Sequence, residues 1–348
     1  MKDASHRSGT TESSCAAERP RIYLDSPPRV LGQPARASRR GALRYLMTFH
    51  SGHPYSLAAG RLERQARATG WFNRVETFHP GMRHPAMVAF LAKHDDFVRR
   101  HSRGYGYWRW KPLLITALLE SLPEGAHLYY VDAGCELSRL GWGRFAALDD
   151  ELTGRGVLCF ENAFPEAGWC KREAVDAIVG GWNEAVMSSR QIQATWFGLR
   201  NVATVRDWIA EWAFWAAQDA LITDWHDPSR QHPRFQEHRH DQALWSLVLK
   251  KHGVEPLSQE DCFEKWLYVR DSWVLLAPVH GLRSRGARSL IDGIVAASTE
   301  QGCLDNLRAP STRLKRRLAI SRLQARTIGV LSRLRSRVRA ELRSGRVA

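Results

Sequence analysis

The sequence contains no run of about 18–20 apolar residues, the length a helix needs to cross a membrane. Its first 21 residues have no apolar segment, so a secretory signal is not predicted. The six cysteines form no Cys-x-x-Cys pair, which argues against a zinc ribbon and a thioredoxin-like site. Scattered cysteines of this kind are typical of reduced thiols, so we expect a cytoplasmic protein.

The positive charge is unevenly distributed along the chain. The 348 residues include 51 Lys and Arg against 36 Asp and Glu, a net charge of +15. Residues 306–348 contribute +12 and residues 1–40 contribute +4, so the remainder sums to −1. A near-neutral body of this size predicts a large core and excludes a protein that coats nucleic acid with its whole surface. We expect a disordered leader over 1–40, one domain over 41–290 and a basic helical tail over 291–348.

Apolar runs alternate with helical periodicity in the first half of this domain. Strands are expected at 43–49, 72–78, 127–131 and 156–160, and helices at 56–69, 85–101 and 113–122. Further on, helices are expected at 203–220 and 241–252, with a polar loop at 224–240 and a strand at 273–279. Alternating strands and helices predict an α/β fold with a mainly parallel sheet, which binds ligands beyond the carboxyl ends of its strands.

An acidic residue directly follows one apolar strand, in Tyr130-Val131-Asp132-Ala133-Gly134. A carboxylate at this position can face the ligand crevice and bind Mg²⁺ or Mn²⁺ that bridges a nucleotide diphosphate. The alternative is a solvated aspartate in a turn that ends the strand.

The stretch Gly104–Pro112 places two glycines among aromatic residues, a composition that suits neither a helix nor a strand. Tyr107 and Trp108 can stack on a ligand or cover an edge of the core. Lys111 lies near the start of the next expected helix, where backbone N–H groups and a cation together favour an anion.

Two further groups of polar residues follow in the second half. Asp241 and Gln242 stand at the start of an expected helix, where the aspartate could be an N-cap or could face an acceptor hydroxyl. His280 is followed by Arg283 and Arg285, which together could bind a metal and a diphosphate, or form a solvated basic turn.

Three motifs considered together resemble a known family. These are Gly104-Tyr105-Gly106-Tyr107-Trp108-x-Trp110-Lys111-Pro112, Tyr130-Val131-Asp132-Ala133-Gly134-Cys135-Glu136 and His238-Arg239-His240-Asp241-Gln242. In order and separation they resemble bacterial GT-A-type glycosyltransferase-like proteins of capsule, lipopolysaccharide and exopolysaccharide biosynthesis. The resemblance covers about Leu43 to Arg285. It implies a Rossmann-like GT-A domain, a nucleotide-sugar donor and a saccharide or lipid-linked acceptor.

The resemblance also implies a metal site. Asp132 falls where such enzymes carry the first acid of an Asp-x-Asp motif, and Gly134 replaces the second acid. Glu136 is a candidate substitute, and His280 falls where a late histidine completes the site. The expected cofactor is therefore Mn²⁺ or Mg²⁺, held by Asp132, Glu136 and His280.

The same resemblance assigns catalytic roles to Asp241 and Gln242. Contacts with the nucleotide or the sugar are expected from Thr48, Ser51, Tyr107, Trp108, Lys111, Gln191, Arg283 and Arg285. In an inverting reaction Asp241 would deprotonate the acceptor hydroxyl. In a retaining reaction the leaving phosphate would do so, and the Asp-Gln pair would only position substrate.

Beyond residue 311, Leu and Val recur at helical spacing with Arg between them, the pattern of a cationic amphipathic helix. We expect it to dock on an anionic membrane at the inner face, where lipid-linked acceptors reside; a solvated tail is the alternative.

Two rival functions stay open. A catalytically inactive sugar-binding or scaffold protein is favoured by Gly134, and a nucleic-acid-binding protein would act through the tail, although no nucleic acid is expected for the near-neutral body.

Overall fold

The computed structural model describes residues 41–258, 277–289 and 291–292. The expected leader and basic tail lie outside the described residues, as does most of the strand expected at 273–279. The three described cysteines, Cys135, Cys159 and Cys170, are buried.

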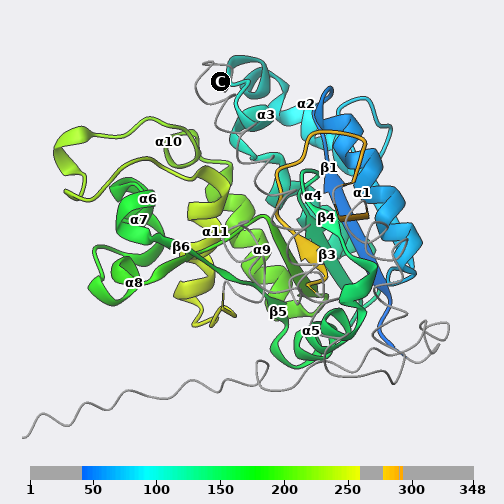
Figure 1. The fold of residues 1–348 in the computed structure, drawn as a ribbon. Helices are drawn as coiled ribbons and strands as arrows, with labels where there is room; N and C mark the ends of the chain where they lie inside the picture. Colours follow the sequence, from blue (N-terminus) through cyan, green and yellow to red (C-terminus); the bar gives the residue numbers. More distant parts are fainter. Residues whose placement is uncertain (1–40, 259–276, 290, 293–348) are drawn as a thin grey trace, which may run out of the picture. The chain divides into compact units, whose positions relative to one another are not determined.

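A five-stranded sheet forms the centre of the fold, in the order β2-β1-β3-β8-β5 (Figure 1). Its strands are β1 (Arg44–Phe49), β2 (Arg74–Phe78), β3 (His127–Val131), β5 (Val157–Leu158) and β8 (Trp196–Arg200). Strand β1 pairs in parallel with β2 and β3, whereas β8 is antiparallel to both β3 and β5. Four strands therefore run in one direction and β8 in the other, which confirms the predicted α/β fold with a mainly parallel sheet.

Helices flank this sheet, and the structure also contains two small two-stranded sheets. The helices are α1 (Tyr55–Thr69), α2 (Pro85–Arg100), α3 (Gly104–Tyr107), α4 (Trp110–Ser121), α5 (Trp142–Arg155), α6 (Glu166–Trp169), α7 (Arg172–Val179), α8 (Glu184–Ser188), α9 (Ala203–Ala216), α10 (Asp219–Ile222) and α11 (His240–Lys251), with 3-10 turns at Arg139–Gly141 and Pro228–Arg230. These antiparallel sheets pair β4 (Glu136–Leu137) with β9 (Val279–His280) and β6 (Glu161–Pro165) with β7 (Arg190–Ile192).

The alternation of side chains along each strand divides the core into two clusters. Met47, Tyr130 and Phe197 face the cluster that α2, α4, α9 and α11 cover. Leu46 and Tyr129, on the opposite pleat, face the cluster that α1 and α5 cover. Strands buried on both faces read as continuous apolar runs, and this explains why the sequence located them.

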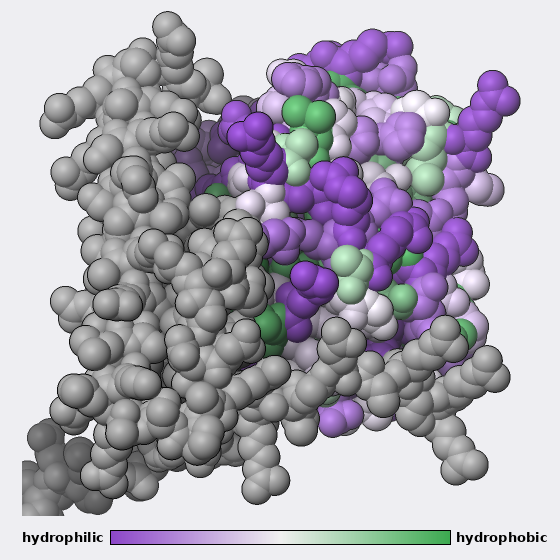
Figure 2. All heavy atoms as spheres, turned by 45° about the vertical axis from the view of Figure 1, so that its right-hand side comes forward, coloured by the Kyte–Doolittle hydropathy of each residue, from purple (hydrophilic) through white to green (hydrophobic). Residues whose placement is uncertain are grey.

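The surface that Figure 2 shows is mainly hydrophilic, with apolar side chains scattered among polar ones. Large exposed apolar residues on α1 and α2 are few, namely Tyr55, Leu57 and Val88. Within the described residues, no helix combines the length and the apolar character needed to span a bilayer.

Candidate functional site

Three charged residues that are far apart in the sequence meet at the carboxyl edge of the sheet. Asp132 directly follows β3, Lys111 is the second residue of α4, and Asp241 is the second residue of α11. The ammonium of Lys111 lies 2.8 Å from Asp241 Oδ2 and 3.6 Å from Asp132 Oδ1, and it donates to the carbonyl of Ala194 at 3.1 Å. We call Lys111, Asp132 and Asp241 the charged cluster.

The members of the charged cluster differ in burial. The Lys111 and Asp241 side chains are 3% and 8% exposed, whereas that of Asp132 is 38% exposed. Burial lowers the pKa of Lys111, but the two carboxylates outweigh it, so this pKa is raised and the lysine is charged. Burial raises the pKa of Asp241 to about 6 against the opposing effect of Lys111. Asp132 also accepts a hydrogen bond from the hydroxyl of Tyr130, and is the member that a ligand in solvent can reach.

The side chain of Gln242 lies next to β7 and is hydrogen-bonded to Gln191. Gln242 Nε2 donates to Gln191 Oε1 at 2.7 Å, and the backbone N–H of Ala194 donates to Gln242 Oε1 at 3.3 Å. The structure therefore joins the expected catalytic pair to the expected donor-sugar segment around Gln191.

The aromatic stretch before α4 forms a left-handed turn. Residues 104 to 108 all have positive φ, with values of 58°, 56°, 81°, 52° and 59°. A Cβ on Gly104 would lie 2.4 Å from the ring of Trp108, so only glycine fits there. The Tyr107 hydroxyl donates to Asp224 at 2.9 Å, and the rings of Tyr107 and Trp108 lie 4.6 and 5.7 Å from that of His240, next to Asp241. The glycine spacing indicated irregular backbone, but not five consecutive left-handed residues.

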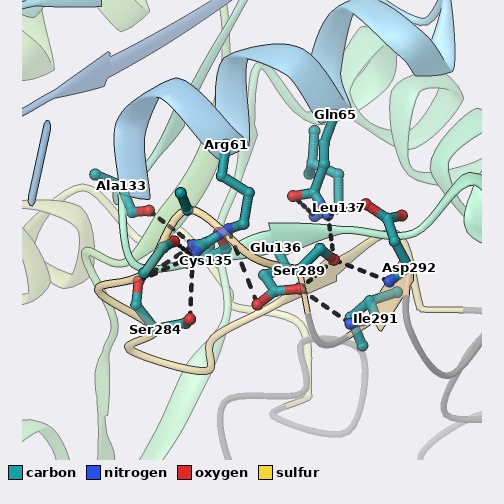
Figure 3. A network of polar contacts seen from close by, with 12 residues as sticks. Arg61, Gln65, Ala133, Cys135, Glu136, Leu137, Ser284, Ser289, Ile291 and Asp292 are labelled. Carbon is teal, nitrogen blue, oxygen red and sulfur yellow. Dashed lines mark hydrogen bonds and ion pairs between the residues drawn. The ribbon is translucent and has the colours of Figure 1, made fainter. Parts of the chain in front are cut away.

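The structure does not place Glu136 as a metal ligand. Its carboxylate is fully buried and accepts from Ser289 Oγ at 2.7 Å and from the N–H of Ile291 at 3.0 Å, and Arg61 Nε lies 3.9 Å away (Figure 3). These partners occupy the carboxylate that was expected to replace the second acid of the motif.

The position of the missing second acid is tightly packed. A Cβ on Gly134 would lie 3.0 Å from the Cα of Arg283, closer than a side chain tolerates without a shift of that backbone. His280 pairs with Glu136 in the β4–β9 sheet, and burial lowers the pKa of His280 to about 4. Among residues 41–258 and the described part of 277–292, no group of three His, Cys, Asp or Glu side chains could hold a metal ion. Asp132, Glu136 and His280 thus do not form the expected metal centre, and we derive no catalytic step through a metal.

Arg61, on α1, forms hydrogen bonds both to the segment after β9 and to the turn that contains Asp132. Its guanidinium donates to Ser284 Oγ at 3.0 Å, to the Gly286 carbonyl at 2.5 Å and to the Cys135 carbonyl at 2.9 Å (Figure 3). The N–H of Ser284 also donates to the carbonyl of Gly134 at 2.9 Å. Arg283 and Arg285 flank Ser284, so this network holds the backbone of both expected diphosphate contacts beside the Asp132 turn.

The remaining expected contacts lie around the end of β1 and the start of α1. Ser51 is exposed just after β1, and the guanidinium of Arg285 lies 5.2 Å from the ring centre of Tyr55 at the start of α1. Thr48 is fully buried inside β1, so the structure does not place its side chain where a nucleotide could contact it. A threonine next to the end of an apolar strand gave no sign of which face of the sheet it would occupy.

Sequence reasoning missed four residues that contact this site: Arg61, Tyr130 and Asp224, described above, and Glu166, which accepts from Gln191 Nε2 at 2.9 Å. Tyr130 lies in an apolar run and read as core, and Asp224 lies in the polar loop before Asp241. Arg61 and Glu166 lie in helices where a charged residue normally faces solvent, so no local signal distinguished them.

No protein-family model and no curated protein matches this sequence. Among solved structures, the chain is similar to mouse xyloside xylosyltransferase 1 in its apo form, at 12% identity and a TM-score of 0.35, over 71% of this chain and 95% of that chain. It is also similar to the apo structure of the bifunctional glycosyltransferase WbbM, at 12% identity and a TM-score of 0.34, over 60% of this chain but only 37% of that chain. Because both TM-scores are low, we infer the function from the site and not from these structures.

Proposed function

We propose that this protein is a glycosyltransferase that moves a sugar from a nucleotide-diphosphate donor to a hydroxyl of a saccharide or lipid-linked acceptor in surface polysaccharide synthesis. The observation that supports it is the charged cluster at the carboxyl edge of the sheet, where α/β proteins bind ligands. Each of the three motifs that resemble GT-A-type proteins supplies one residue to this cluster: Lys111, Asp132 and Asp241.

The proposed reaction uses Asp241 beside the acceptor. With a pKa of about 6, this carboxyl is ionised near neutral pH and still basic enough to accept a proton from a hydroxyl. In an inverting reaction it would do so directly. In a retaining reaction the leaving phosphate takes the proton, and Asp241 and Gln242 hold the sugar. Either way, Lys111 keeps Asp241 charged within a buried site.

The donor's diphosphate needs positive charge as it departs. In our proposal Arg283 and Arg285 supply this charge, since the Arg61 network holds their segment beside Asp132. The exposed carboxylate of Asp132 would accept hydrogen bonds from donor hydroxyl groups. Tyr107 and Trp108, near His240 and Asp241, would pack against the apolar face of a sugar.

The test is a thermal-shift panel with nucleoside diphosphates and nucleotide sugars. A ligand at 100 times its Kd adds about 2.7 kcal/mol to the free energy of unfolding, so Tm should rise by several degrees. Asp132→Ala should remove this shift without loss of folding, and Asp150→Ala, an exposed acid on α5, is the matched control. No shift with any nucleotide would overturn the proposal. A shift without sugar transfer or donor hydrolysis would instead support a catalytically inactive sugar-binding protein.

For location, we propose that residues 306–348 dock on an anionic membrane, because each basic residue near such a surface contributes about 1 kcal/mol. Sedimentation with vesicles containing phosphatidylserine should carry down the full chain but not a chain that ends at residue 305. Equal binding of both chains would overturn this proposal. Tail-dependent binding of RNA with a steep salt dependence would support nucleic acid as the partner instead.

A further inference from the structure

A fully buried carboxylate, Glu166 at the start of α6, takes no direct part in the charged cluster. Its Oε1 lies 2.8 Å from the ammonium of Lys250 and accepts from the hydroxyl of Ser246. Its Oε2 accepts from Gln191 Nε2 at 2.9 Å. Burying a carboxylate costs free energy unless its ion pair and hydrogen bonds are kept. We therefore expect the position of Glu166 to be fixed by these contacts.

The charge of Glu166 fixes the direction of a chain of hydrogen bonds. A carboxylate can only accept, so Gln191 must turn its amide nitrogen toward Glu166 and its amide oxygen toward Gln242. Gln242 must then turn its nitrogen toward Gln191, at 2.7 Å, and its oxygen toward the N–H of Ala194, at 3.3 Å. One ionised carboxyl thus determines how both amides are oriented. We call Glu166, Gln191 and Gln242 the glutamate relay.

The glutamate relay ends at a residue that also contacts the charged cluster. The N–H of Ala194 donates to Gln242, and the carbonyl of Ala194 accepts from Lys111 at 3.1 Å. If the relay ran in the opposite direction, the Gln242 nitrogen would face the Ala194 N–H, and two donors would oppose each other. Ala194 would have to move, and with it the carbonyl that holds Lys111 beside Asp241.

We propose that Glu166 is a positioning residue: its charge sets the orientation of the Gln242 amide and the place of Ala194, and so presents the Gln242–Asp241 edge to the donor sugar. The inference rests on the proposed function in that the Gln242 edge is taken to face the sugar. Lys250 supports the buried charge from the far side, where it also donates to Ser189 Oγ at 2.7 Å and to the Arg190 carbonyl at 2.8 Å.

A pair of substitutions tests the direction of the relay. In Glu166→Gln, the new amide oxygen can still accept from Lys250 and Ser246, but its nitrogen then faces Gln191. The side-chain amides of Gln191 and Gln242 must then both reverse their orientation. As a result, the Gln242 nitrogen and the Ala194 N–H, which are both donors, face each other. In the double variant Glu166→Gln with Gln191→Glu, the new carboxylate at position 191 accepts from both sides. The original orientation of Gln242 is then restored, and the contact that is lost is the 3.4 Å hydrogen bond from Gln191 Nε2 to the Trp169 carbonyl.

The expected result is a loss of about 10- to 100-fold in kcat for Glu166→Gln, with a change in KM for the donor below about threefold. The double variant should recover to within about threefold of wild type. Glu161→Gln, which removes an ion pair with Arg190 in the β6–β7 sheet but leaves the relay intact, is the matched control and should keep full kcat. A role that is only structural would not be rescued by exchanging the acid and the amide.

Spectra of the ¹⁵N-labelled glutamine side chains and of the Ala194 amide test the relay without turnover. The resonances of the Gln242 side chain and of the Ala194 amide should shift in Glu166→Gln and return in the double variant. Wild-type kcat in Glu166→Gln, or a double variant that fails to fold or to recover both readouts, would overturn the relay. A wild-type protein that transfers no sugar while the resonances shift and return would refute the proposed function and leave the relay standing.

Discussion

Replacing Lys111 with methionine would leave two carboxylates in the charged cluster without their shared cation. The Lys111 ammonium lies 2.8 Å from Asp241 Oδ2, where the attraction is about 6 kcal/mol at an effective dielectric constant of ~20. The desolvation of the lysine offsets part of this. Breaking a buried pair by removing one partner therefore costs about 3–5 kcal/mol. We expect Lys111→Met to lower the free energy of unfolding by this amount at pH 8.

The pH dependence of this loss identifies its origin. In wild type, Asp241 has a pKa of about 6 against an ordinary value of 3.8, so this group alone makes the fold less stable as pH rises from about 4 to about 6. Without Lys111 the folded-state pKa rises further, so the penalty continues to grow above pH 6 in the variant but not in wild type. At pH 5 Asp241 is mostly protonated in both proteins. The loss should then shrink to about 1–2 kcal/mol.

Urea unfolding followed by tryptophan fluorescence at pH 5, 7 and 8 measures this loss. Lys93→Met, at an exposed position on α2, is the matched control and should stay within about 0.5 kcal/mol of wild type. Adding Asp241→Asn to Lys111→Met should recover most of the stability at pH 8, because it removes the unpaired charge. A loss that does not change between pH 5 and pH 8, or one below about 1 kcal/mol at pH 8, would refute this account of the charged cluster.

Three further predictions concern the turn before α4, metal binding and Asp241. Gly104→Ala should lower the free energy of unfolding in urea by about 1–3 kcal/mol, because its Cβ would meet the Trp108 ring at a φ of 58°. The control is Gly154→Ala in α5, whose Cβ would meet nothing within 4 Å, and it should be neutral or stabilising. Calorimetry with Mn²⁺ alone should give a Kd weaker than about 10⁻⁴ M, since Asp132 is the exposed carboxylate of the site; micromolar binding would contradict the site as described. If Asp241 is the base, kcat/KM should rise as pH passes through about 6 as Asp241 loses its proton, and Asp241→Asn should abolish that step; an unchanged profile in the variant would exclude this role.

The sequence predicted the bounds of most strands and of the flanking helices closely, because their apolar residues recur at regular spacing. The strand at 127–131 was expected at those residues, and the first helix was expected one residue after its start at Tyr55. The helix expected at 203–220 is instead two, since α9 ends at Ala216 and Gln218, in extended conformation, precedes α10. An apolar pattern that continues across both helices gave no sign of this break.

The sequence by itself determined that Asp132 ends a buried strand and that Lys111 begins a helix, because burial and chain direction follow from local pattern. Only the tertiary structure decided which charges meet. It paired Lys111 with Asp132 and Asp241, but it turned Glu136 toward Arg61 and buried Thr48 and His280. The physical reason is that local pattern sets how a residue is exposed along its own element, whereas its ion-pair partner comes from another element whose position depends on how the whole core packs.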